Sequence, residues 1–446
     1  MKRNLSKPCG AAGLMLVFLA ALRCTALDGG LMSRIFVPVY LLLIGALALL
    51  LLRRSGYDAR TLAVMLAPIG LALFVRALFF SYATLDYQDF LSQWVEYFRQ
   101  NGGLAALKDP VGNYNVPYLY MLALISYLPI PDLYLIKLFS IVFDVLLAWG
   151  GLRIVKHFTM SDSKAPLVCF AALLLLPTAV LNSGAWAQCD AVYAALCVLS
   201  LACVFEKKPV WSLALLALAF SFKLQAVFLI PLWLALWLTG RVKFKHLLVF
   251  PAVFVGSMVP ALAAGKPVGD ILSIYLDQAG SESQHAYLNF NSPSIFSLVP
   301  HGVEPGDGLA KVGIAAAFLF VLAVLGLLLW KRKSVTDASL LLAGAALAMG
   351  IPFFLPYMHE RYFFLGGVLA LIWACAAPFR SSLALPAAVG AEVASLGGYH
   401  AYFFTRYALV LTLFGTTWTT LTECLLMLFA LTYLTASLVR ARLKGA

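Results

Sequence analysis

The feature that most constrains this chain is the recurrence of apolar stretches that are each about as long as a membrane-spanning helix. Of its 446 residues, 63% are hydrophobic and only 12% are charged, whereas soluble proteins carry about 25% charged residues. A soluble fold of this length could not bury so much apolar surface. The sequence therefore excludes an ordinary soluble enzyme and predicts an all-α, polytopic membrane protein.

Windows of about 20 apolar residues predict about 13 to 14 spans. Two stretches are ambiguous. Residues 116–130 are short and end in prolines, so they could cross the membrane or lie on its surface as an interfacial helix. Residues 210–240 are too long for one crossing and could form two short helices that meet at Lys223.

Basic residues indicate how these stretches lie, because cytoplasmic loops are enriched in Lys and Arg. If 116–130 does not cross and 210–240 crosses twice, six basic clusters fall on the side of the N-terminus. These clusters are Arg53/Arg54/Arg60, Arg153/Lys156/Lys164, Lys207/Lys208, Arg241/Lys243/Lys245, Lys331/Arg332/Lys333 and Arg440/Arg442/Lys444. The net charge of +12 is thus an orientation signal rather than a sign of nucleic-acid binding, and both termini are expected in the cytoplasm.

The outer side then holds two large loops, 81–132 and 265–308, and most of the polar chemistry. In the first loop, Asp86 and Asp89 would face the same way on a helix. They could act on a substrate at the membrane surface, or simply cap a helix N-terminus. No P-loop or Gly-rich dinucleotide motif indicates a nucleotide site.

Four further outer segments carry candidate residues. Trp186, Gln188 and Asp190 stand at a helix end, where Asp190 needs a partner. Lys223 could bind a phosphate or extend to the lipid headgroups. The cluster His359-Glu360-Arg361 could serve acid–base chemistry, bind phosphate or form a structural ion pair. Asn289 suits sugar hydroxyls and, slightly better, an ordinary turn.

The order and spacing of several short motifs resemble the GT-C superfamily of membrane glycosyltransferases, in particular bacterial relatives of the second mannosyltransferase of GPI-anchor synthesis. The motifs are the segment 86–94, GNYNVPYLYMLALISYLP (112–129), WAQCDAVY (186–193), FSFKLQAVFLIP (220–231) and MHERYFF (358–364). The resemblance covers about residues 61–380, which would be the catalytic core. Residues 1–60 and 381–446 would be additional N-terminal and C-terminal membrane helices.

The resemblance implies transfer of a hexose, with mannose favoured, from a polyprenyl-phosphate-sugar to an extracytoplasmic glycan, glycolipid or protein acceptor, with inversion at the anomeric carbon. Asp86 would be the general base, with the second catalytic carboxylate, Asp89, beside it, and Lys223, His359 and Arg361 would bind the donor phosphate. The remaining candidate substrate contacts are Trp94, Tyr114, Asn115, Trp186, Gln188, Asp190, Gln225, Asn289 and Glu360.

Other activities and a cofactor stay open at this point. Two acids could hold Mg²⁺ or Mn²⁺ together with waters, although nothing in the sequence demands a metal. A transporter or flippase of lipid-linked sugars would use Asp144, Glu392 and Glu423 as an ion path, but the chain shows no internal repeat. A polysaccharide polymerase or ligase would be expected to carry one dominant outer loop.

Overall fold

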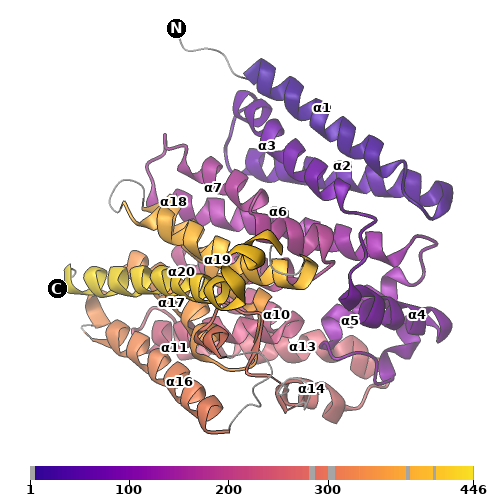
Figure 1. Cartoon of the computed structure of the whole chain (residues 1–446). Coiled ribbons are helices and arrows are strands. Elements are labelled where there is room, and N and C mark those ends of the chain that lie inside the picture. The colour runs from indigo at the N-terminus through magenta and orange to yellow at the C-terminus, as the bar shows by residue number, and fades with distance from the viewer. Residues whose placement is uncertain are drawn as a thin grey trace.

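The computed structural model describes residues 6–280, 287–299, 307–330, 332–377, 382–404 and 408–444. Parts of the expected second outer loop, residues 281–286 and 300–306, therefore lie outside the described residues. The described chain is a bundle of helices whose long axes run roughly parallel (Figure 1). Within it, the strands are the two-residue pair β1 (Asn289–Phe290) and β2 (Met358–His359), which run parallel. The predicted all-α membrane fold is confirmed.

Nineteen α-helices follow one another along the described chain. They are α1 (Ser6–Cys24), α2 (Gly30–Arg54), α3 (Ala59–Leu78), α4 (Ser92–Gln100), α5 (Val116–Ile125), α6 (Asp132–Phe158), α7 (Ala165–Leu174), α8 (Pro177–Ala179), α9 (Asp190–Phe205), α10 (Pro209–Phe222), α11 (Ile230–Leu238), α12 (Phe244–Leu247), α13 (Val249–Ala263), α14 (Val268–Gly280), α16 (Asp307–Leu329), α17 (Asp337–Phe354), α18 (Phe364–Ala376), α19 (Ala384–Phe404) and α20 (Ala408–Lys444).

Nine helical segments of the described chain are long and apolar enough to cross a membrane, fewer than the expected number of spans. Several other apolar stretches form shorter helices, such as α9 with 16 residues and α10 with 14 residues. Every residue of α9 except Val204 is buried, so this helix lies in the centre of the bundle. A helix that is shielded by its neighbours does not need the full length of a lipid-exposed span.

The stretch 210–240 turns back at Lys223, as the charge pattern predicted. Helix α10 begins next to the end of α9, where Arg153 of α6 pairs with Glu206 at 2.7 Å. Lys223 is extended (φ −153°, ψ 133°) and ends the helix. After the 3₁₀ turn η4 (Leu224–Leu229), α11 returns to the end of the bundle at which α10 begins. There, Arg241 pairs with Asp337 of α17.

The segment between α3 and α6 starts and finishes at the other end of the bundle, away from the end at which α10 begins. Helix α5 therefore does not cross the bundle. The buried Lys137 ammonium, in α6, donates to the carbonyl oxygens of Phe79 at 2.7 Å and Tyr82 at 2.6 Å, just past the end of α3. A lysine placed here satisfies carbonyls that a helix C-terminus leaves unpaired. We call this end of the bundle, which carries α4 and α5, the loop end.

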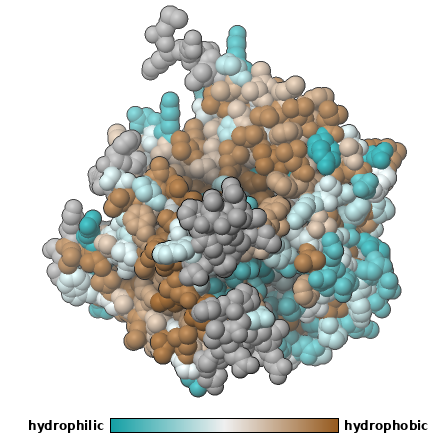
Figure 2. Space-filling model, viewed as in Figure 1, coloured by the Kyte–Doolittle hydropathy of each residue, from teal (hydrophilic) through white to brown (hydrophobic). Residues whose placement is uncertain are grey.

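Basic residues gather at the other end, which we call the basic end. Besides Arg153 and Arg241, Lys156 donates to Ser55 O at 2.7 Å and Arg442 to Ser334 O at 2.8 Å. Lys331 and the side chain of Lys444 lie outside the described residues. Hydrophilic residues cover the side of the molecule that carries α4 and α5, and apolar residues cover the face over α1 and α2 (Figure 2).

The embedded acids lie at separate places in the bundle instead of forming a shared path. Asp144 pairs with Arg76 at 2.9 Å, and both side chains are 1% exposed. Glu392 accepts hydrogen bonds from the backbone N–H and the hydroxyl of Thr178 at 2.7 and 2.9 Å. The carboxylate of Glu423 packs against Gly397 of α19. These placements do not favour the ion path that a transporter would need.

The Arg76–Asp144 pair gives a test of the packing between α3 and α6. Asp144→Ala should lower the free energy of unfolding by about 3–5 kcal/mol, because it leaves a buried guanidinium without its counter-charge. The double variant Arg76→Met/Asp144→Leu should recover most of that loss, since it removes both charges. Denaturation of the protein in detergent micelles measures both values. Equal losses in the single and the double variant would contradict this account.

Candidate active site

Asp86 stands at the loop end, directly before a π-helical turn, η1 (Tyr87–Leu91). Its Oδ2 atom accepts hydrogen bonds from Trp186 Nε1 at 3.0 Å and from Gln188 Nε2 at 2.9 Å. Its backbone N–H donates to the Tyr402 hydroxyl at 3.0 Å. These contacts fix the carboxylate, while its side chain remains 25% exposed.

A strained backbone brings both of these donors to the same oxygen. Ala187, between Trp186 and Gln188, has φ +61°, which lies in the left-handed backbone region that residues other than glycine rarely adopt. The π-helical turn η3 (Val180–Ala185) comes directly before this segment. Strained residues and π-turns of this kind are concentrated at functional sites.

The C-terminal part of the chain supplies further contacts to Asp86 and Trp186. The Trp186 ring stacks on the ring of Tyr402 with centroids 4.0 Å apart and meets the ring of Tyr399 edge-on at 5.1 Å. Both tyrosines belong to α19. A Cβ atom on Gly398 of the same helix would come within 2.7 Å of Glu360 Cβ, so the glycine allows α19 to approach closely.

Asp190 and Lys223 form a buried ion pair beside this cluster. The distance from Lys223 Nζ to Asp190 Oδ1 is 2.5 Å, and the two side chains are 5% and 0% exposed. Asp190 Oδ2 also accepts a hydrogen bond from Asn182 at 2.7 Å. Each of the two buried charges thus has the counter-charge that its burial requires. The pair also fixes Lys223 at the turn between α10 and η4.

Arg361 lies across the site from Lys223. Its Nη1 atom is 3.1 Å from Glu360 Oε1 and 3.8 Å from Asp86 Oδ2, and its guanidinium carbon lies 5.4 Å from the ring centroid of Trp186. Its Nε–H is buried and has no hydrogen-bond partner among the described residues. An unpaired buried donor of this kind costs about 1–3 kcal/mol, so a bound acceptor group would be favoured here.

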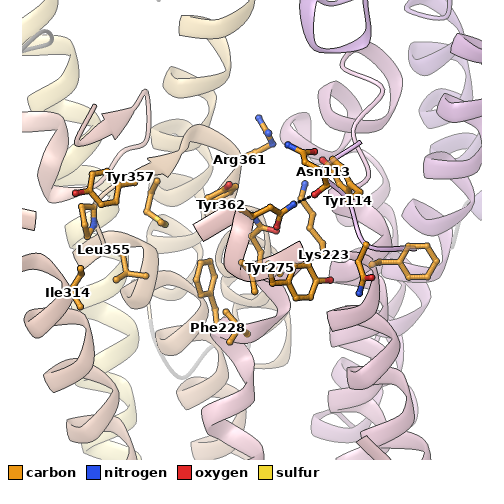
Figure 3. Close-up of a pocket in the computed structure, with 18 residues that line it drawn as sticks. Asn113, Tyr114, Lys223, Phe228, Tyr275, Ile314, Leu355, Tyr357, Arg361 and Tyr362 are labelled. Atoms are coloured by element: carbon orange, nitrogen blue, oxygen red, sulfur yellow. Dashed lines mark hydrogen bonds between the residues drawn. The ribbon is translucent and has the colours of Figure 1, made fainter. Parts of the chain in front are cut away.

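A cavity of about 410 Å³ joins these two cations to the apolar interior of the bundle (Figure 3). At one end it is lined by Lys223, Arg361 and Gln225, and the Oε1 atom of Gln225 is buried without a partner among the described residues. At the other end it is lined by apolar side chains, among them Phe228, Val227, Ile314 and Leu355. Val227 and Ile314 are exposed at the surface of the bundle. We call this space the cationic cavity.

Of the remaining candidate residues, three lie at the cationic cavity or next to it, and Asn289 lies in a turn. Tyr114 and Asn115 line the cationic cavity, and the Tyr114 hydroxyl donates to Gln188 Oε1 at 3.4 Å. Trp94 is one step removed, because its ring packs against that of Tyr114 with centroids 5.9 Å apart. Asn289 closes a turn through two hydrogen bonds with Ser292, at 2.9 and 3.0 Å, which is the alternative that its sequence favoured.

Asp89 and His359 do not join the cluster in the way that the sequence suggested. Asp89 is exposed, because the π-helical turn is wider than an α-helical turn and a spacing of three residues does not align its side chain with Asp86. His359 lies in β2, where its ring stacks on Phe290 with centroids 4.6 Å apart. Burial, together with the charges of Arg361 and Lys223, holds the pKa of His359 well below its usual value. Its ring is therefore neutral near pH 7.

A metal would find few protein ligands in this region. Across the described part of the chain, no group of three or more His, Cys, Asp or Glu side chains is arranged to hold a metal ion. Mg²⁺ or Mn²⁺ bound at Asp86 would therefore depend on water or substrate oxygens for most of its coordination.

Sequence reasoning missed the contributions of α14 and α19. Tyr402 lies 316 residues from Asp86 in the sequence, and Tyr275 of α14 lines the cationic cavity. Neither residue belongs to a motif with a recognisable spacing. Aromatic residues near the end of an apolar helix are common in membrane proteins, so their identity alone carried no signal.

Glu360 gives a test that depends on pH. Burial raises its pKa to about 7, opposed in part by Arg361. The folded protein then holds this proton more tightly than the unfolded chain, so the stability due to Glu360 is lost as the pH rises from its normal pKa through about 7. The melting temperature of the wild type should therefore fall relative to that of Glu360→Gln between about pH 5 and about pH 8. A difference that does not change with pH would contradict the buried, protonated carboxyl.

Comparison with known proteins identifies the family to which the chain belongs. The family model described as glycosyltransferase family 87 matches residues 113–356, more than half of the chain. No curated protein matches the sequence. The matched region contains the Trp186–Asp190 segment and Lys223, whereas Asp86 and Arg361 lie outside it. The chain thus belongs to glycosyltransferase family 87, a family of the GT-C type, and is a membrane glycosyltransferase.

Proposed function

We propose that the enzyme transfers a hexose from a polyprenyl-phosphate-linked donor to a hydroxyl of an extracytoplasmic acceptor, with Asp86 as the general base. The observation that carries this proposal is the cationic cavity, which combines two cations at one end with an apolar surface at the other. A lipid-linked sugar phosphate has the same division between an anionic and an apolar part. The resemblance of the motifs to a GPI-anchor mannosyltransferase favours mannose as the sugar.

The donor phosphate would lie between Lys223 and Arg361. The Lys223 ammonium uses one of its three donors on Asp190, and the Nε–H of Arg361 is unpaired among the described residues. Both residues can therefore donate to phosphate oxygens without giving up their present partners. The prenyl chain would pass Phe228 and leave between Val227 of η4 and Ile314 of α16, where the cavity reaches exposed apolar side chains.

The position of Asp86 suits removal of a proton from the acceptor. Its Oδ2 is held by Trp186 and Gln188, whereas its Oδ1 accepts no hydrogen bond from the residues that the structure describes. The free oxygen can accept the proton of an acceptor hydroxyl at a part of the site that solvent reaches. Arg361 connects the base to the cavity, because it contacts Asp86 and lines the cavity wall.

In the proposed reaction the acceptor oxygen attacks the anomeric carbon of the sugar while Asp86 takes its proton. The new C–O bond forms as the bond from the anomeric carbon to the phosphate oxygen breaks on the opposite side, which inverts the configuration. The bonding electrons leave with the polyprenyl phosphate. Lys223 and Arg361 would stabilise the negative charge that develops on this leaving group.

The loop end is proposed to face away from the cytoplasm. The support is the gathering of basic residues at the other end of the bundle, because Lys and Arg are retained on the cytoplasmic side. In this orientation both termini are cytoplasmic, and the protein lies in the cell membrane as a multi-pass enzyme.

Asp86→Asn tests the base directly. The substitution keeps the size of the side chain but removes its ability to accept a proton, so kcat should fall by about 100- to 10,000-fold. Turnover of a polyprenyl-phosphate-linked hexose by the purified enzyme, with products identified by mass spectrometry, measures this. Asp89→Asn is the matched variant from the same loop and should keep most of the activity. A larger loss at Asp89 than at Asp86 would reverse the assignment.

Arg361→Gln tests the phosphate site. If Arg361 stabilises the departing phosphate, kcat should fall on the order of 100-fold, with little change in the KM of the acceptor. Arg99→Gln, which alters an exposed arginine of α4, is the control with the same change of charge. An effect of Arg361→Gln on acceptor KM alone would argue against a role in donor binding.

A further inference from the structure

A second cavity lies beside the cationic cavity at the loop end and has a different chemical character. Its volume is about 460 Å³, and it lies between residues 110–116 and helix α14. Two aspartates of α14, Asp270 and Asp277, stand at its exposed rim. We call it the acidic cavity.

The two cavities share one wall. Asn113, Tyr114, Asn115 and Gln278 line both of them. Gln278 of α14 donates a hydrogen bond to the backbone carbonyl of Asn113, which ties the helix to the loop. Because Tyr114 also contacts Gln188, which holds Asp86, the shared wall is separated from the proposed base by a single side chain.

Local packing holds the floor of the acidic cavity in place. Gly112 has φ +67°, and a Cβ atom there would lie 2.9 Å from the Trp94 ring, so both its backbone conformation and this close contact favour glycine. Lys266 is buried and donates to Asp109 O at 2.8 Å, so its ammonium is engaged with the loop. Lys266 thus fixes the loop, and together with Asp270 and Asp277 it leaves the cavity with a net negative charge.

We propose that the acidic cavity binds the acceptor, and that the acceptor group bound there is an uncharged sugar. Carboxylates, amides and a serine hydroxyl are the groups that hydrogen-bond to sugar hydroxyls, and the cavity offers Asp270, Asp277, Ser273 and Asn115. The Nδ2 atom of Asn115 is buried and has no hydrogen-bond partner in the described chain, so a ligand oxygen would satisfy it. This inference rests on the proposed transferase reaction.

Charge separates the substrates of the two cavities. Lys223 and Arg361 favour a phosphate in one, whereas Asp270 and Asp277 disfavour an anion in the other. The acceptor is therefore a neutral hexose unit rather than a phosphorylated sugar or a uronic acid. The polyprenyl phosphate product is likewise kept out of the acceptor cavity.

Saturation-transfer NMR on the full-length enzyme in detergent tests the proposal without turnover. The probes are mannotriose and a matched trisaccharide that ends in glucuronate. Wild type should bind mannotriose, and Asp270→Asn/Asp277→Asn should weaken this binding about tenfold or more and improve that of the glucuronate probe. Glu96→Gln removes an acid from α4, outside the acidic cavity, and should change neither.

A second variant keeps the test decisive if the aspartate variant folds poorly. Ser273→Phe should fill the acidic cavity and abolish mannotriose binding, and an unchanged melting temperature in detergent shows that this variant is folded. Mannotriose binding that survives both variants would overturn the inference. If the variants lose mannotriose binding but the wild type cleaves no polyprenyl-phosphate donor, the inference holds and the proposed donor is wrong.

Discussion

The buried ion pair between Asp190 and Lys223 is the interaction on which the rest of the site depends. A lysine and an aspartate that are 5% and 0% exposed can remain charged only as partners. Their pairing joins the first turn of α9 to the point where the chain reverses between α10 and η4. That reversal places the Lys223 ammonium at the wall of the cationic cavity and allows α11 to return to the basic end.

The other charged side chains of the site also lie next to a partner or next to a cavity that could hold a ligand. Asp86, Glu360 and Arg361 form a second group, in which one guanidinium contacts two carboxyls. The cationic cavity opens toward apolar side chains and the acidic cavity toward the polar loop end. The proposed transfer from a lipid-linked donor to an acceptor that enters from the aqueous side would use this division, because its two substrates would arrive from different solvents. The proposed base stands beside the wall that both cavities share.

Much of the fold could be predicted because burial in a bilayer leaves a strong pattern in the sequence. The apolar runs predicted the helices, and the basic clusters predicted both the reversal at Lys223 and that residues 116–130 do not cross the bundle. The site was only partly predictable. The π-helical turn after Asp86 prevents Asp89 from facing the same way as Asp86, and no periodic pattern in the sequence predicts such a turn. The contact between Asp86 and Tyr402 depends on packing between distant helices, which single-sequence motifs do not record.

The central claim is that a lipid-linked phosphate binds between Lys223 and Arg361. A cryo-electron microscopy structure of the enzyme with a polyprenyl phosphate tests it most directly. The account predicts phosphate density within hydrogen-bond distance of Lys223 Nζ and Arg361 Nε, with the prenyl chain passing Phe228 and leaving between Val227 and Ile314. Density for the phosphate at the basic end, or in the acidic cavity, would contradict the account.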